Sequence, residues 1–142
     1  MRLNNINIDT IKTYVNPLRI DNIINKNIEE MVKHYIRDKK KYSDMDEDDY
    51  RKYIKDGIDN ILCDLEPDIN YITTIILNDE DPEDIIRDNG LSLEPLFDYY
   101  SGYPHKAIVD YAKAMIKQRL EIVIREYARE VANKIREELQ ND

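Results

Sequence analysis

The chain has 142 residues, of which 42% are hydrophobic and 36% charged, and its formal net charge at pH 7 is −9. This length predicts a single domain over residues 1–142 with a buried core. The only cysteine, Cys63, excludes an intramolecular disulfide framework and a cysteine-rich zinc site. No apolar run approaches the ~20 residues of a membrane span, and the first residues lack a signal-peptide pattern. We therefore expect an intracellular protein of the cytoplasm, or of the host cytoplasm if it is viral.

The charge is distributed unevenly along the chain. Residues 1–42 contain nine Lys/Arg and five Asp/Glu, whereas residues 43–103 contain four and eighteen. Residues 104–142 are almost balanced, with eight and seven. A strongly acidic middle segment creates a local negative field, which attracts cationic surfaces and repels nucleic acid.

Apolar residues recur at helical spacing through most of the chain. This pattern predicts an all-α fold in which five to seven helices pack against one long C-terminal helix. A short first helix is predicted over residues 9–16, ended by Pro17. A second helix is predicted to begin near Asp21, a good N-cap residue. It runs to the lysines at positions 39–41, whose charge suits the C-terminal end of a helix.

The middle of the chain predicts two further segments. Ser43 or Asp44 is expected to cap a third helix, which has an acidic first turn and cannot continue through Pro67. The following segment, residues 68–78, fits either a helix capped by Asp68 or a β-strand, because it is rich in β-branched residues. We favour the helix, since a lone strand would have no partner elsewhere in the chain.

Two short helices are expected before the last one. Asp81 followed by Pro82 is typical of a helix start, with Pro at the first helical position, and Gly90 is a natural residue at the end of that helix. Residues 92–100 predict another short helix.

The last predicted helix opens at Pro104 and runs to about Leu139 without a further Gly or Pro. About 36 residues at 1.5 Å each make a rod of roughly 54 Å. A compact globule of this length has a diameter of about 37 Å. The helix is therefore too long to be covered entirely by its own domain.

The C-terminal half of this helix presents a narrow apolar stripe. Its polar sides predict ion pairs four residues apart, Glu121–Arg125 and Glu130–Lys134. We expect self-association into a homodimer through the stripe, or alternatively that the N-terminal helices fold back along it. The stripe consists of Tyr127, Val131, Ile135 and Leu139.

No motif predicts catalysis, a cofactor or a metal. Asp44, Asp46 and Asp48 resemble the opening of an EF-hand loop, but Asp49 stands where the loop needs Gly and Lys55 where it needs a bidentate Glu. The three glycines stand alone, so there is no phosphate-binding glycine loop. We assign no catalytic, cofactor-binding or metal-binding residue and expect a non-enzymatic protein.

Two acidic runs are the candidate partner-binding residues. They can be interpreted structurally, as acidic first turns that stabilise helix N-termini, but that interpretation does not explain why so few bases balance them. The candidate residues are Asp44, Asp46, Glu47, Asp48 and Asp49 in the first run, and Asp79, Glu80, Asp81, Glu83 and Asp84 in the second.

The functional hypothesis is an acidic module that docks onto a basic protein. In its sharper form it is a phage- or mobile-element-encoded inhibitor that blocks the nucleic-acid-binding surface of a host defence protein. The alternative is a helical oligomeric adaptor or structural protein that associates through its C-terminal helix. Nucleic acid itself is not an expected partner, because the chain as a whole would repel a polyanion.

Overall fold

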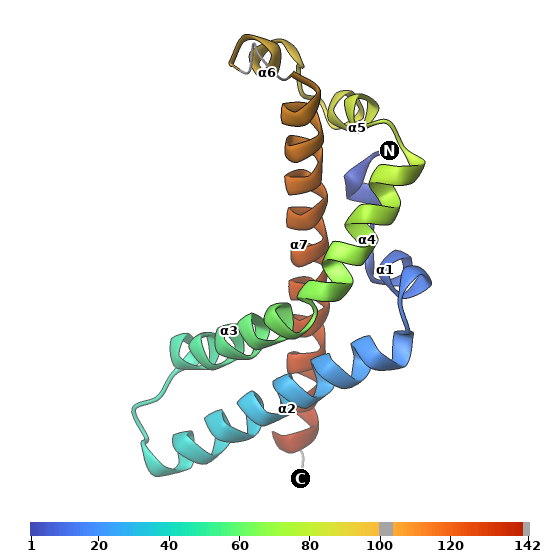
Figure 1. The fold of residues 1–142 in the computed structure, drawn as a ribbon. Coiled ribbons are helices and arrows are strands. Elements are labelled where there is room, and N and C mark those ends of the chain that lie inside the picture. The colour runs from blue at the N-terminus through green and yellow to red at the C-terminus, as the bar shows by residue number, and fades with distance from the viewer. Residues whose placement is uncertain (100–103, 141–142) are drawn as a thin grey trace. The chain divides into compact units, whose positions relative to one another are not determined.

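In the computed structural model, which describes residues 1–99 and 104–140, the chain is helical throughout its regular structure (Figure 1). The described residues contain seven α-helices and no strand, which confirms the predicted all-α class and the long C-terminal helix. Among these helices, none is long and apolar enough to cross a membrane. The elements are η1 (Leu3–Asn5, a 3-10 helix), α1 (Ile8–Tyr14), α2 (Pro17–Lys41), α3 (Glu47–Asp64), α4 (Glu66–Asp79), α5 (Pro82–Asp88), α6 (Glu94–Tyr99) and α7 (Pro104–Gln140).

The chain groups into two compact units, each built from two separate stretches. Unit 1 comprises Met1–Tyr14 and Pro67–Val123, and unit 2 comprises Val15–Glu66 and Ile124–Asp142. Helix α7 therefore contributes its first part to unit 1 and the remainder to unit 2. The single domain expected over residues 1–142 stays a prediction.

The start of α2 differs from the prediction. The helix begins at Pro17 rather than near Asp21, and Asn16 is its N-cap, with the Asn16 side chain accepting a hydrogen bond from the Leu18 amide at 3.0 Å. Proline is tolerated there because the first amides of a helix have no intrahelical acceptor to lose. The first helix, predicted over residues 9–16, ends already at Tyr14, and Pro17 opens the next helix.

The cap of α3 also differs from the prediction. Ser43 and Asp44 lie in the turn before the helix, and Asp46 caps it. The Asp46 carboxylate accepts from the amides of Asp48 and Asp49 at 3.0 and 3.2 Å, while the Asp49 carboxylate accepts from the Asp46 amide at 3.0 Å. This reciprocal capping box satisfies amides that have no acceptor within the first turn of the helix.

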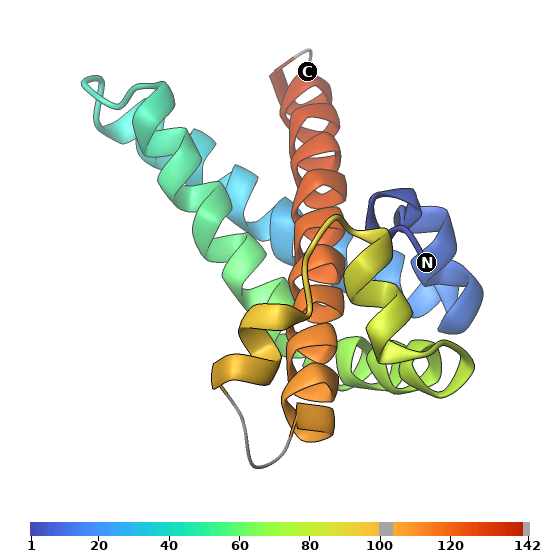
Figure 2. The same ribbon diagram turned by 90° about the horizontal axis from the view of Figure 1, so that it is seen from above.

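Unit 2 is organised around α2 and α3, which run side by side and antiparallel (Figures 1 and 2). The two helices approach closely at Gly57, where a Cβ atom would lie 2.7 Å from Cγ of Met31. Tyr35 lies at the centre of the unit, 1% exposed, with its hydroxyl donating to the Asp46 carbonyl at 3.2 Å. The buried apolar side chains of unit 2 are Ile20, Ile24, Ile28, Val32, Tyr35, Tyr50, Ile54, Ile58, Ile61, Leu65, Ile124, Ala128, Val131 and Ala132.

Unit 1 confirms three local predictions. Residues 68–78, which fit either a helix or a strand, belong to helix α4; the helix begins at Glu66, so Asp68 lies within it and is not its cap. Asp81 caps α5 and Pro82 opens it, and Gly90 follows the helix with a φ of +81°, a conformation that favours glycine. The helix predicted over residues 92–100 is observed as Glu94–Tyr99, and its predicted last residue lies outside the described residues.

The N-terminal segment is held within unit 1 by side chains from elements far along the chain. Arg119 donates to three backbone carbonyls, those of Leu3 at 3.1 Å, Asn4 at 3.3 Å and Ile6 at 3.1 Å. Asn89 accepts from the Leu3 amide and donates to the Met1 carbonyl, each at 2.9 Å. These contacts fix the segment next to α5, where Figure 2 shows the N-terminus.

Candidate functional site

The first acidic run, residues 44–49, is only partly free to meet a partner. Asp46 and Asp49 are engaged in the capping box of α3. Asp48 forms an exposed ion pair with Arg51 at 3.4 Å, which contributes little to stability. Asp44 is exposed and has no ion-pair or hydrogen-bond partner among the described residues. Asp44 and Asp48 are thus the carboxylates of this run that the fold does not require.

Glu47, the remaining member of this run, is paired with α7. Both carboxylate oxygens accept from the guanidinium of Arg136, one of them at 2.9 Å from Nη1. The hydrogen bond from Arg136 lowers the pKa of Glu47 and raises the pKa of Arg136, so both groups are charged at neutral pH. The same guanidinium lies 4.2 Å above the ring of Tyr50, in cation–π contact. Glu47 therefore serves chiefly to hold α3 against α7.

The second acidic run, residues 79–84, lies at the start of α5 in unit 1. Asp81 is the N-cap and accepts from the Glu83 amide at 3.0 Å. Glu83 and Asp84 lie 3.6 and 3.9 Å from Arg87, at the limit of an ion pair. Asp79 is exposed and without a partner among the described residues.

Glu80 completes this run and faces the N-terminus. It pairs with the Met1 ammonium group at 3.0 Å, and Asp88 pairs with the same group. The hydrogen bonds that the Met1 ammonium donates to Asp88 and Glu80 raise its pKa. Asp79 and Asp84 thus remain the least engaged carboxylates of the second run.

The two acidic runs belong to different units. Unit 1 contains seven Lys/Arg and twelve Asp/Glu, and unit 2 contains fourteen and eighteen. The acidic middle of the sequence is therefore divided by the fold, and each unit keeps a small acidic excess.

The apolar stripe predicted for self-association is largely occupied within unit 2. Val131 is 8% exposed, and the Tyr127 hydroxyl donates to the Asp21 carboxylate of α2 at 2.7 Å. Ile135 and Leu139 are half-buried. Helices α2 and α3 thus both contact this part of α7, in line with the alternative that N-terminal helices cover it. Self-association stays a prediction.

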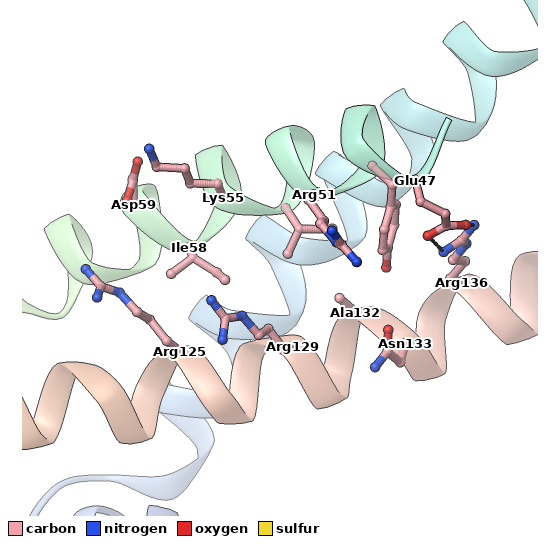
Figure 3. A pocket seen from close by; sticks show the side chains of 12 residues that line it. Glu47, Arg51, Lys55, Ile58, Asp59, Arg125, Arg129, Ala132, Asn133 and Arg136 are labelled. Atoms are coloured by element: carbon pink, nitrogen blue, oxygen red, sulfur yellow. Dashed lines mark hydrogen bonds and ion pairs between the residues drawn. The ribbon is translucent and has the colours of Figure 1, made fainter. Parts of the chain in front are cut away.

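Unit 2 contains a groove between α3 and the C-terminal part of α7 with a volume of about 770 Å³. Arg125 and Arg129 point from α7 toward α3, whereas Arg51 points from α3 toward α7 (Figure 3). Lys55 lies on the same stretch of α3, and Arg136 closes one end. The lining is completed by Glu47, Tyr50, Ile54, Ile58, Asp59, Ala132 and Asn133. Five cations and two anions thus line a groove in an acidic protein.

Two cations of this groove are paired, Arg51 with Asp48 and Arg136 with Glu47, and the other three are not. Among the described residues, no carboxylate lies within 4.0 Å of Arg125, Arg129 or Lys55. The ion pair predicted between Glu121 and Arg125 is accordingly not formed. Two polar atoms of groove residues, the Tyr50 hydroxyl and Nε of Arg136, are buried without a hydrogen-bond partner. Such atoms are uncommon in folded proteins. The arrangement can bind an anion.

The groove was not found from the sequence. The signal was present as arginines four residues apart on α7, Arg125 and Arg129, and a matching pair four residues apart on α3, Arg51 and Lys55. Each pair alone is typical of a solvated helix face. The packing of α3 against α7 places these four cationic residues around the same groove.

The remaining candidate groups form no site. Cys63 is exposed. Within residues 1–99 and 104–140, no three His, Cys, Asp or Glu side chains are grouped so that they could hold a metal ion.

Comparison of the chain with protein-family models, with curated proteins and with solved structures finds no match.

Proposed function

We propose that this protein is a non-enzymatic binding module that docks exposed acidic residues onto a basic protein partner. One observation supports this most directly. After the caps and close ion pairs are set aside, Asp44 and Asp48 remain exposed at the start of α3, and Asp79 and Asp84 remain exposed around the start of α5. Exposed carboxylates without strong internal partners steer association with a cationic surface.

The sharper form of the proposal is an inhibitor that occupies the nucleic-acid-binding surface of a host protein, acting in the cytoplasm. A basic surface that binds phosphates presents Lys and Arg side chains. Carboxylates held at a helix start can compete for these side chains. The net charge of −9 supports this form, because it disfavours direct binding of the module to nucleic acid.

The test is affinity capture from a cell lysate at low and high salt, using variants that spare the caps. Asp44→Lys with Asp48→Lys alters the first run, and Asp79→Lys with Asp84→Lys alters the second. We expect that one of these double variants no longer captures a basic protein that the wild type captures. We also expect high salt to weaken capture of that protein by the wild type.

The matched control is Glu137→Lys with Glu138→Lys, which changes the net charge equally at two exposed residues of α7. It should leave the capture unchanged. The captured protein is then tested for competition between this module and DNA or RNA. The proposal fails if no basic protein is retained, or if the control pair releases it as completely as the acidic-run pairs do.

A further inference from the structure

We propose that the groove between α3 and α7 binds a compact polyphosphate, either inorganic triphosphate or the triphosphate moiety of a nucleotide. The groove carries the opposite charge from the acidic runs, and Glu47 is the one member of those runs in its lining. Three arginines line it, Arg51 pointing from α3 toward α7, and Arg125 and Arg129 pointing from α7 toward α3 (Figure 3).

The chemistry of the lining favours phosphoryl groups. The planar fork of arginine matches phosphate oxygens in bidentate hydrogen bonds. Arg125 and Arg129 stand one helical turn apart, so their side chains emerge about 5–6 Å from each other at Cβ. A chain of several phosphoryl groups can contact both of these forks. Orthophosphate carries less charge and reaches fewer of them.

Neutral hydrogen-bond donors supplement the arginines. The Tyr50 hydroxyl is buried beside Arg136, which is only a donor, and it finds no acceptor among the described residues. Burial raises the pKa of Tyr50, so the hydroxyl keeps its proton at neutral pH and can donate it. Asn133 adds an amide donor to the same lining. A phosphate oxygen is an acceptor that both groups can use.

Three features indicate a compact anion rather than a nucleic-acid strand. Glu47 and Asp59 line the groove, so a strand running along it would pass carboxylates. Unit 2 has an acidic excess, which repels a long polyanion outside the groove. The only aromatic ring in the lining is that of Tyr50, which is 7% exposed and offers no face for base stacking.

The experiment is isothermal titration calorimetry of the full chain with sodium triphosphate, ATP and orthophosphate. We expect saturable binding of triphosphate and ATP, with weaker binding of orthophosphate. The variant Arg125→Gln with Arg129→Gln should weaken triphosphate binding by about tenfold or more, because each lost guanidinium removes a charged hydrogen-bond donor. Both residues are exposed, so this variant should fold, which a circular dichroism melt checks.

The control variant is Lys106→Gln with Lys113→Gln, which removes two charges from exposed residues of unit 1. It should bind triphosphate as the wild type does. Equal binding of triphosphate and ATP supports recognition of the phosphate chain alone, and preference for ATP supports a nucleotide. The proposal is overturned if neither ligand saturates, if both variants weaken binding equally, or if a short single-stranded oligonucleotide binds more tightly than triphosphate. It is also overturned if a second copy of the chain occupies the groove, seen as concentration-dependent association that the arginine variant abolishes.

Discussion

Gly57 offers a direct test of the packing between α2 and α3. Replacing a helical glycine by alanine stabilises an unobstructed helix by about 1 kcal/mol. In α3, however, the new Cβ would lie 2.7 Å from Met31 Cγ and 3.4 Å from Ile28 Cδ1. The first distance is too short, so Met31 must move, and overpacking of this kind costs about 1–3 kcal/mol. Because Met31 is flexible and half-exposed, the cost should lie near the lower end.

We therefore expect Gly57→Ala alone to change the free energy of unfolding by no more than about 1 kcal/mol, since the two effects nearly cancel. In a Met31→Ala background the obstruction is gone, and Gly57→Ala should stabilise the protein by about 1 kcal/mol. Urea melts of the wild type, the two single variants and the double variant give the coupling energy between the two substitutions. We expect it to be at least about 1 kcal/mol. A cycle pairing Gly57→Ala with Met115→Ala in unit 1 is the control and should be additive. Additivity within about 0.5 kcal/mol in the Met31 cycle would refute the predicted contact.

Two further predictions concern polar contacts. Arg119→Met removes the donors to three carbonyls of the N-terminal segment, and it should lower the free energy of unfolding by about 1–3 kcal/mol in urea melts; a change within about 0.5 kcal/mol, the range of ordinary surface substitutions, would contradict this role. The pKa of Glu47 is lowered by its hydrogen bond from Arg136, so the stability it contributes is present above the ordinary pKa of 4.5 and is lost as the pH falls through the folded-state value. The free energy of unfolding should consequently fall more steeply below pH 4.5 in the wild type than in Glu47→Gln. If the two proteins lose stability in parallel as the pH falls, the ion pair of Glu47 with Arg136 does not contribute to stability.

Much of the helical fold could be predicted because it depends on local residue chemistry. Asp81 and Pro82 mark the start of α5, and Gly90 marks its end. Each of these signals comes from a single residue: the Asp81 side chain caps the helix, the Pro82 ring fixes φ, and Gly90 adopts a positive φ. The start of α3 was less certain, because every acid in residues 44–49 can cap a helix. The deciding factor is the reciprocal bond between Asp46 and Asp49, which depends on where the first turn actually forms.

The charged surfaces are harder to predict, because the sequence gives the order of the charged residues but not which of them the fold brings together. Glu47 was grouped with the other acids of its run, yet its partner Arg136 lies 89 residues away. Arg125 was assigned to Glu121 by spacing alone, yet it faces the groove. Sequence spacing indicates which residues share a helix face. It does not indicate which other helix covers that face, and this packing decides which charges are neutralised.

The connectivity of the two units has a consequence for experiments that divide the chain. Each unit is assembled from two stretches that are distant in sequence, and the boundary between Val123 and Ile124 lies inside α7. Any single backbone break between residues 14 and 124 therefore leaves at least one unit as two fragments held together only by noncovalent contacts. Neither unit can be obtained as one uninterrupted gene segment. Truncation cannot assign an activity to one of them, and point substitutions within the intact chain are the appropriate means of doing so.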